Sequence, residues 1–353
     1  MNYLIFRNDG IGDLIVSTPL INEIKKNDPN SKVYLITSDR NDEFAELLLN
    51  HIVDHKFRLR SKPTLFELIG LFFKLIKISF NYTIVLKPKN YNYWLAFLLF
   101  PKTKLGVQIV SDYKEGIKHR PSAFLSKILL NYYEIIDYSE NYTKDSNIHH
   151  YQHYLNIFNK FISNHQIDSN KIYRYFRPVF ENEFSHINEY FKNNRITLIH
   201  LDEKWERISW NTKNYIDLIV KIKEKTNNTV IVTEGIRSTY INDEVKNYLM
   251  LESTSVAELN KSSSVNNIYY IQTPSIKLIT YLVYLSNLVV EPHGSLAHIA
   301  SMFNKKTIDL IYPEYINYLK KWKPRTDKYS QISISDFEKT INEINEVIDI
   351  FNC

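Results

Sequence analysis

Short apolar runs alternate with longer amphipathic stretches along most of this 353-residue chain. The alternation begins at Tyr3–Arg7, loses its clarity over residues 111–167, which we expect to be mostly helical, and restarts at Ile196–His200. Strands that alternate with helices are typical of a parallel sheet covered by helices on both faces. The pattern therefore predicts an α/β protein with two Rossmann-like doubly wound domains, and the length suits two domains.

The interruptions of this pattern set the predicted domain boundaries. Residues 1–175 are expected to form an N-terminal domain, and residues 190–330 a C-terminal domain. Residues 331–353 are expected to form a last helix, which opens at Ser335 because Ser335-x-x-Glu338 matches a capping box. One expected position for this helix is against the N-terminal domain.

Charge and cysteine content narrow the expected partners and compartment. The formal net charge of +5 favours an anionic partner, such as a phosphate-bearing substrate or a membrane surface, although a solvated basic surface explains it equally well. Cys353 is the only cysteine, so no disulfide or zinc cluster can form within the chain, as in a reducing compartment. We see neither a signal peptide nor an apolar run of about 20 residues that could span a membrane. We therefore expect a cytoplasmic protein.

A glycine-containing turn after the first predicted strand is the first candidate site. Gly10 and Gly12 would let a ligand approach the backbone, and the start of the following helix favours anions. The third glycine of a dinucleotide fingerprint would fall at Ile15, so the turn is not that motif. Asp13 stands at the start of the helix. It is either a capping residue, worth about 1 kcal/mol, or a functional carboxylate.

Four segments resemble, in the correct order, motifs of glycosyltransferase family 9, the lipopolysaccharide heptosyltransferases. The first is R-N-D-G-I-G-D followed by S-T-P-L, which resembles the R-x-D-x-I-G-D turn and T-P-x-[IL] of that family. The others resemble its third strand with the helix after it, its W-x-x-K-x-[WY] helix start, and its H-L-A-A helix with the strand that follows. They lie at residues 82–107, 209–215 and 298–313.

The resemblance implies a glycosyltransferase B-type fold with the active site in the cleft between the two domains. The acceptor would bind to the N-terminal domain and the nucleotide sugar to the C-terminal one. An inverting displacement needs a base for the acceptor hydroxyl, which by motif match is Asp13, next to Gly12 on the acceptor side. It also needs positive charge near the departing diphosphate, which by motif match is Lys213, although an ordinary exposed lysine is the alternative. No D-x-D motif occurs, so we expect no metal and no cofactor besides the nucleotide-sugar co-substrate.

One segment departs from the family at the place where the donor should be bound. The family carries D-[ST]-G-x-x-H, whereas this chain has E-P-H-G-S-L-A-H, from Glu291 to His298. Either one residue is inserted or His293 replaces the acid. Gly294 and Ser295 still open a helix, so a phosphate or sugar fits there. His298 is equally well explained as a core histidine or as a ligand contact.

Further candidates lie at strand ends and in basic segments. Glu234 ends a strand of the second domain, where open α/β sheets bind ligands, although a plain turn explains it equally well. The N-terminal domain carries basic residues that suit an anionic saccharide or glycolipid acceptor, or an anionic membrane surface near Leu65–Phe80 and Tyr91–Phe100. A solvated face is the alternative. The acceptor candidates are Arg60, Lys87, Lys89 and Arg120.

The sequence thus predicts an enzyme, a metal-independent glycosyltransferase for hexosyl or heptosyl transfer. It would move a sugar from a nucleotide-diphosphate donor to a lipopolysaccharide-core or other surface saccharide at the cytoplasmic face of the inner membrane. Nucleic acid is not an expected partner. Two alternatives stay open: an epimerase-like enzyme that acts on nucleotide sugars with the same fold, and a non-catalytic protein that binds a sugar or nucleotide.

Overall fold

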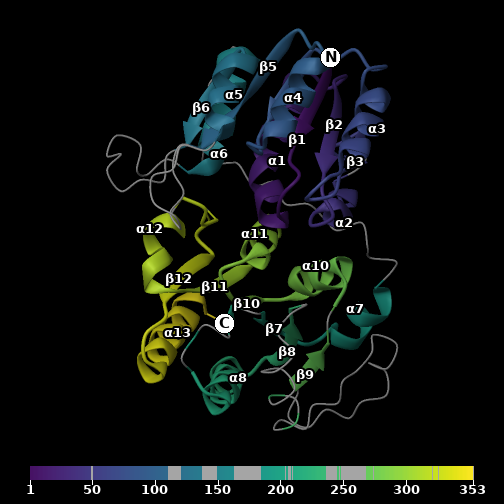
Figure 1. Cartoon of the computed structure of the whole chain (residues 1–353). Coiled ribbons are helices and arrows are strands. Elements are labelled where there is room, and N and C mark those ends of the chain that lie inside the picture. The colour runs from purple at the N-terminus through teal and green to yellow at the C-terminus, as the bar shows by residue number, and fades with distance from the viewer. Residues whose placement is uncertain are drawn as a thin grey trace. The chain divides into compact units, whose positions relative to one another are not determined.

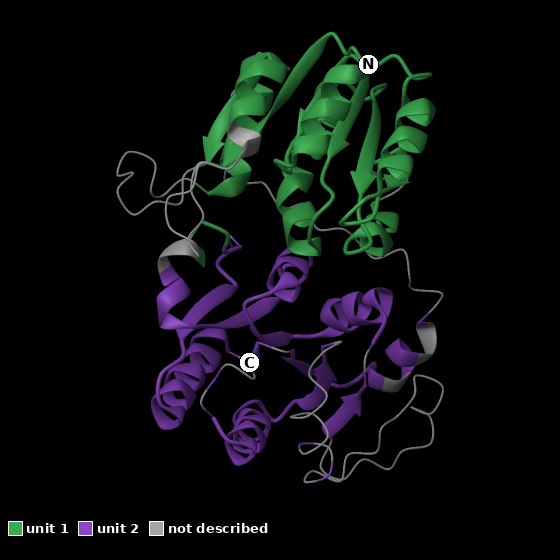
Figure 2. Cartoon of the chain, in the orientation of Figure 1, with its two compact units in different colours: residues 1–174, 318–322 green, residues 175–317, 323–353 purple. Residues whose placement is uncertain are grey.

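The computed structural model divides the chain into two compact units (Figures 1 and 2). Unit 1 comprises Met1–Arg174 and Tyr318–Trp322, and unit 2 comprises Tyr175–Asn317 and Lys323–Cys353. The structure describes residues 1–48, 51–109, 121–136, 149–162, 184–202, 204–205, 208, 210–235, 245, 247, 268–272, 274–319, 321–324 and 326–352.

Unit 1 is built on a six-stranded sheet in which every neighbouring pair is parallel. Across the sheet the order is β3 (His55–Arg58), β2 (Lys32–Thr37), β1 (Asn2–Phe6), β4 (Tyr82–Val85), β5 (Thr103–Ile109) and β6 (Tyr132–Ile136). The central strand β1 is buried, as expected for a parallel sheet that is covered on both faces.

The helices of unit 1 cover both faces of this sheet. They are α1 (Ile11–Asn27), α2 (Asp42–Glu46), α3 (Leu65–Leu75), α4 (Asn90–Leu98), α5 (Pro121–Leu129) and α6 (His150–Phe161). Helices α3, α4 and α5 share one apolar core with Leu4 and Phe6 of β1, so these three helices cover the same face. Helix α1 packs against α6. Helices before and after β3 lie on opposite faces because the crossover connections are right-handed. The chain adds strands on one side of β1 up to β3 and on the other side from β4 onward.

Unit 2 repeats the same strand order. Its parallel sheet runs β12 (Tyr329–Ser333), β11 (Lys306–Ile311), β10 (Leu288–Pro292), β7 (Ile196–Leu201), β8 (Thr229–Glu234) and β9 (Ile268–Ile271). Its helical elements are α7 (Ser185–Phe191), α8 (Thr212–Thr226), α10 (Ile276–Leu285), α11 (Ser295–Met302), η3 (Pro313–Tyr315) and α13 (Phe337–Phe351), and the short helix α12 (Ile316–Leu319) begins in unit 2 and ends in unit 1. The predicted fold class, two doubly wound Rossmann-like sheets, is confirmed.

Each sheet contains one point at which the winding reverses. In unit 1, β1 lies between β2 and β4, and in unit 2, β7 lies between β8 and β10. The loops that leave such neighbouring strands diverge, and ligands bind there at the carboxyl ends of the strands. We therefore expect ligands at the loops after β1 and β4 in unit 1, and at those after β7 and β10 in unit 2.

Residues 111–167 are mostly helical where they are described, in α5 and α6, as expected. The sequence did not predict β6, which lies between these helices and forms an edge of the sheet; its half-buried sequence has a weak strand pattern. The last helix begins one residue later than expected, since Asp336, not Ser335, accepts the capping hydrogen bond, from the amide of Lys339.

The last helix, α13, belongs to unit 2, and the expected position against the N-terminal domain stays a prediction. It packs against α8, β11 and β12. Lys221 and Lys225 of α8 form ion pairs with Glu338 and Asp349 of α13. Of the helices described, none is both long enough and apolar enough to cross a membrane.

Candidate functional site

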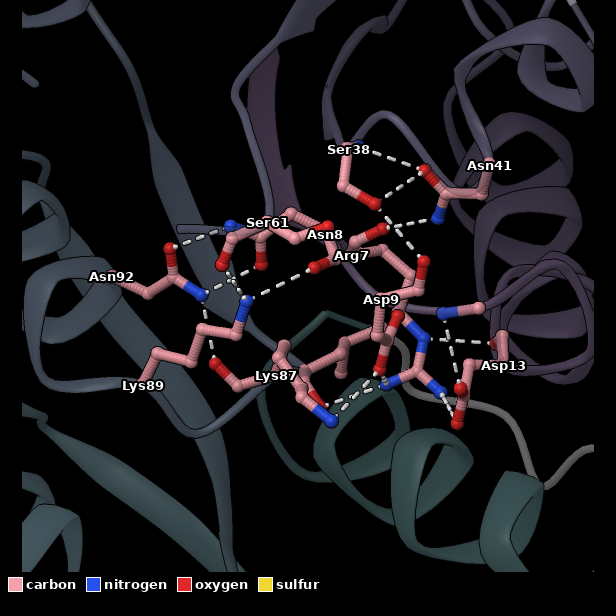
Figure 3. A network of polar contacts seen from close by, with 12 residues as sticks. Arg7, Asn8, Asp9, Asp13, Ser38, Asn41, Ser61, Lys87, Lys89 and Asn92 are labelled. Atoms are coloured by element: carbon pink, nitrogen blue, oxygen red, sulfur yellow. Dashed lines mark hydrogen bonds and ion pairs between the residues drawn. The ribbon is translucent and has the colours of Figure 1, made fainter. Parts of the chain in front are cut away.

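The loop after β1 is organised around a buried arginine. Arg7 is only 2% exposed, and its guanidinium donates three hydrogen bonds (Figure 3). Nε donates to the backbone oxygen of Asp13 over 2.8 Å, Nη1 to that of Leu86 over 2.9 Å, and Nη2 to Oδ1 of Asp13 over 3.1 Å. Arg7 therefore ties the loop after β1 to the loop after β4 and fixes the start of α1.

Asp13 is the third residue of α1 and carries out the capping role that its position suggested. The helix is capped by Gly10, whose amide donates to Oδ2 of Asp13 over 3.2 Å. The other carboxylate oxygen faces Arg7, and the side chain stays 29% exposed. Because the carboxylate is oriented on both sides and still reaches solvent, the capping and functional interpretations are compatible. Gly12 is the second residue of the same helix.

Asp9 is a second carboxylate at this edge, and it was not among the residues predicted from the sequence. It is 8% exposed, and its Oδ2 lies 3.3 Å from Nη1 of Arg7 and 3.5 Å from Nζ of Lys87. Burial, helped by the charge of Asp13, raises the pKa of Asp9 to about 6, although Arg7 and Lys87 oppose the shift. The first acid of R-x-D-x-I-G-D was the signal that could have identified it.

Lys87 and Lys89 follow β4 and reach the same edge of the sheet (Figure 3). Lys89 donates to the backbone oxygens of Ser61, over 3.1 Å, and Asn8, over 3.4 Å. Its burial, followed by the nearby charge of Lys87, lowers the pKa of Lys89. The structure thus brings both predicted lysines to the edge of the sheet where Asp9 lies. The ammonium of Lys89, however, already donates to backbone oxygens of two loops, those of Asn8 and Ser61.

Polar side chains from the loop after β2 fix the backbone of the β1 loop. Asn41 donates from Nδ2 to the backbone oxygen of Arg7 over 2.7 Å, and the hydroxyl of Ser38 donates to that of Asp9 over 3.0 Å. Ser38, Asn41, Arg7 and Asp9 are all buried, so these hydrogen bonds fix the backbone that carries Arg7 and Asp9.

The other predicted acceptor residues are not part of this network. Arg60 lies in the connection before α3, where its exposed side chain pairs with Glu67 over 2.6 Å. Arg120 lies outside the described residues.

In unit 2 the corresponding edge contains a glycine with little space around it. Gly294 caps α11, and Ser295 is the first residue of that helix. A Cβ atom on Gly294 would lie 2.8 Å from Nζ of Lys204 and 3.1 Å from Oε2 of Glu291. Glycine is therefore what allows an ammonium and a carboxyl group to approach the backbone at the start of α11. Lys204 also pairs with Asp202 over 2.9 Å.

Glu291 and His293 have different neighbours. Glu291 is buried in β10, and this burial, helped by Asp309 and opposed by Lys204, raises its pKa well above the usual range. His293 turns to Asp309, with Nδ1 2.6 Å from Oδ2, and the hydroxyl of Tyr329 donates to the same carboxylate. Glu291, then, is the acid beside the start of α11, and a protonated Glu291 can donate a hydrogen bond there.

The remaining predicted donor residues lie elsewhere in unit 2. Glu234 is buried and accepts a hydrogen bond from the hydroxyl of Tyr270 over 2.6 Å. Lys213 is the second residue of α8 and is exposed. His298 is buried in α11, with its ring centroid 6.0 Å from that of His293.

Lys204 and Asp309 were missed for a topological reason. Lys204 follows β7 and Asp309 lies within β11, and both become neighbours of Glu291 only because β10 pairs with β7 and with β11. No local motif marks them. In the part of the chain that the structure describes, no three His, Cys, Asp or Glu side chains are grouped so as to hold a metal ion.

This chain resembles known proteins in its structure and not detectably in its sequence. No protein-family model matches the chain, and no curated protein sequence does. The structure of a glycosyl transferase of family 9 from Veillonella parvula matches with a TM-score of 0.70 and 12% identity, over 97% of this chain and 90% of that one. The E. coli ADP-heptose LPS heptosyltransferase II matches with a TM-score of 0.69 and 12% identity over the full length of both chains. The chain has the fold of these transferases.

Two further structures define the range of this B-type fold. The E. coli heptosyltransferase WaaC, solved with ADP, matches with a TM-score of 0.70 and 12% identity, over 99% of this chain and all of the other. The UDP-GlcNAc 2-epimerase from Neisseria meningitidis, solved with UDP-GlcNAc, matches with a TM-score of 0.56 and 11% identity, over 99% and 92%. The predicted likeness to family 9 structures is confirmed, and the epimerase is less similar.

Proposed function

We propose that this chain is an inverting glycosyltransferase that moves a sugar from a nucleotide-diphosphate donor to a saccharide acceptor. The observation that carries the proposal is the carboxylate of Asp13. It is oriented by Arg7 and by the amide of Gly10, it keeps access to solvent, and it stands at the carboxyl edge of the unit 1 sheet. A base that must meet a hydroxyl group needs this combination of fixed orientation and access.

In the proposed reaction, unit 1 binds the acceptor. Asp13 takes the proton from the acceptor hydroxyl while its oxygen attacks the anomeric carbon of the donor sugar. One C–O bond forms, and the bond between that carbon and the diphosphate oxygen breaks. Lys87, which is partly exposed beside Asp9, supplies a positive charge for an anionic acceptor.

Unit 2 binds the donor in this proposal. The diphosphate lies at the start of α11, where Gly294 and Ser295 offer backbone amides and Lys204 offers an ammonium group. Lys213, at the start of α8, is the second candidate for charge neutralisation. Glu291 donates a hydrogen bond to the donor in its protonated form. The proposed reaction uses these cations in place of a metal ion.

ADP-heptose is the first donor to test, with a phosphorylated lipopolysaccharide-core saccharide as the acceptor. Similar structures support this choice, because the E. coli enzymes are named for heptosyl transfer and one was solved with ADP and with ADP-2-deoxy-2-fluoro heptose. The proposed location is the cytoplasmic face of a membrane that carries the acceptor.

The test is a panel of nucleotide sugars that includes ADP-heptose and UDP-GlcNAc. Each is scored first by the shift in melting temperature of the full chain, then by transfer to acceptor with and without EDTA. We expect one donor to stabilise the protein and to be consumed only when acceptor is present. Conversion without acceptor would instead identify an epimerase, and no stabilisation by any donor would contradict the proposal.

A further inference from the structure

Exposed apolar side chains are concentrated on one face of unit 1. Thirteen large hydrophobic side chains are exposed among the described residues, and ten of them lie on α3, α4 and α5 or directly after these helices. These three helices cover the same side of the sheet, as their shared core shows. We call their outer surface the α3–α5 face. Scattered exposed apolar residues are ordinary, whereas a continuous group marks an interaction surface.

Helix α3 contributes half of this group (dark blue in Figure 1). Leu71 and Leu75 anchor it to the core. Leu65, Ile69 and Phe73 recur every four residues on its opposite side, and all three are exposed. Phe66 and Ile76 extend this outer stripe, and Phe66 is 85% exposed. A helix that is apolar on both sides is expected where both sides are covered, by protein or by lipid.

The other two helices continue the apolar surface. Trp94 and Leu98 of α4 are four residues apart and exposed, and Phe100 directly after this helix is 76% exposed. Phe124 and Ile128 of α5 show the same spacing and are exposed too. Helices α4 and α5 pack against each other. The exposed residues are therefore a property of the face, not of one helix.

Charge identifies the occupant of this face. Residues 60–80, 90–104 and 121–130 contain seven Lys or Arg and a single acid, Glu67, which is already paired with Arg60. Lys74 lies in the last turn of α3 and Lys127 in that of α5. Because the three helices run in the same direction, these cations gather along one edge of the face. Apolar side chains bordered by cations are what an anionic lipid surface binds.

We propose that the α3–α5 face docks unit 1 on an anionic lipid bilayer, with the Phe, Trp, Leu and Ile side chains inserted among the acyl chains and the lysines at the headgroups. A second copy of this chain fits poorly, because the face carries seven Lys or Arg and a single acid that is already paired, and so offers its own copy no complementary charge. The proposal itself needs no transfer activity, since it rests only on this surface.

The test is flotation of the full chain with vesicles, in the absence of any nucleotide sugar or saccharide. We expect binding to vesicles of phosphatidylcholine with 30% phosphatidylglycerol, at least tenfold weaker binding to phosphatidylcholine alone, and loss of binding at high salt. The double variant Phe66→Ser/Phe73→Ser and the double variant Lys74→Gln/Lys77→Gln should each reduce binding at least tenfold. All four side chains are exposed, so the melting temperature should not fall.

Matched controls change exposed residues outside the α3–α5 face, in helix α13 of unit 2 and at Lys32, the first residue of β2. Ile350→Ser removes an equally exposed apolar group from α13, and Lys32→Gln/Lys339→Gln removes the same charge; each should bind within twofold of wild type. Absence of wild-type binding, or equal loss in the controls, would overturn the proposal. So would a dimer without lipid that the phenylalanine variant dissociates. If the phenylalanine variant has a lower melting temperature than wild type, the binding of the lysine variant and the salt dependence of wild-type binding test the proposal in its place. Because no donor is present, failure here is separate from failure of the proposed transfer.

Discussion

Nη2 of Arg7 lies 3.1 Å from Oδ1 of Asp13, and Nε of the same arginine holds the backbone oxygen of Asp13. This relationship gives Asp13 a defined direction as well as a position. We expect Asp13→Asn to keep the fold and the donor-induced rise in melting temperature but to lower kcat by about 10² to 10⁴-fold. Single-turnover transfer assays measure the loss.

Asp13→Ala separates catalysis from capping. It removes the acceptor of the Gly10 amide as well as the base, so melting temperature should fall in addition, by the equivalent of about 1 kcal/mol. Asn keeps an oxygen for that amide. Full transfer activity in the Asn variant would exclude Asp13 as the base, whatever its effect on stability.

Arg7→Lys should destabilise unit 1 although the charge is kept. The guanidinium makes three directed hydrogen bonds and pairs with Asp9, and a single ammonium cannot reproduce this arrangement. We expect a loss of about 2–4 kcal/mol in the free energy of unfolding, the usual range for a broken buried pair. Urea unfolding at constant pH measures it. Arg60→Lys, at an exposed pair, should leave the free energy of unfolding nearly unchanged, and equal effects of the two substitutions would contradict the structural role of Arg7.

Asp9 should make stability fall as pH rises from about 4 to 6. Its pKa is raised from 3.8 to about 6 in the folded chain, so in this window the unfolded chain has released a proton that the folded chain keeps. Asp9→Asn has no such proton. Its free energy of unfolding relative to wild type should therefore rise by about 1–3 kcal/mol between pH 4 and pH 8. A difference that does not change with pH would show that Asp9 is not perturbed.

Asp54 provides a control of opposite sign. Burial opposes the shift, but the hydrogen bonds from Lys25 and from the amide of Val33 lower the pKa of Asp54 overall. Its carboxylate therefore stabilises the fold above the unfolded pKa, and this contribution disappears as pH falls through the folded pKa. Asp54→Asn should lose stability relative to wild type at pH 7 and regain it in acid, measured by the same urea titrations.

Gly294→Ala tests the close approach at the start of α11. The backbone there is extended, with φ near −158°, so a side chain causes no strain of its own, but the new Cβ would displace the ammonium of Lys204. Because that ammonium ends a flexible chain, we expect stability to change by less than about 1 kcal/mol while the Kd for the donor rises about tenfold or more. Isothermal calorimetry measures the Kd.

Gly70→Ala is the matched control for this substitution. Gly70 lies within α3, and nothing lies within 4 Å of the place of its Cβ. Alanine there should raise the free energy of unfolding by about 0.5–1 kcal/mol and leave donor binding unchanged. Equal loss of donor binding in both variants would show that the effect is not local to Gly294.

The local pattern of the sequence predicts well whatever depends on neighbours along the chain. The helix that begins after Gly10 and the strand Lys32–Thr37 follow directly from apolar spacing and glycine placement. Edge strand β6 escaped prediction because an edge strand is only half covered, which weakens its apolar pattern.

The candidate site was predictable only in part. Asp13 and Gly294 stand in motifs at helix starts, and the structure places both at carboxyl edges of the sheets. Lys204 and Asp309 depend on which strands pair across the sheet, which no local pattern specifies. Glu234 ended a strand as expected, but its carboxylate is bound by Tyr270, a contact set by the pairing of β8 with β9.

The short segment Tyr318–Trp322 belongs to unit 1 although the chain on either side of it belongs to unit 2. The ring of Trp322 stacks on His150, with centroids 3.5 Å apart, and the backbone oxygen of Lys321 accepts from the amide of His150. A gene fragment that stops at Arg174 would therefore encode an incomplete unit 1, in which the ring of His150 has lost its stacking partner Trp322. Exchanging the two units between chains of this fold calls for three junctions, not one.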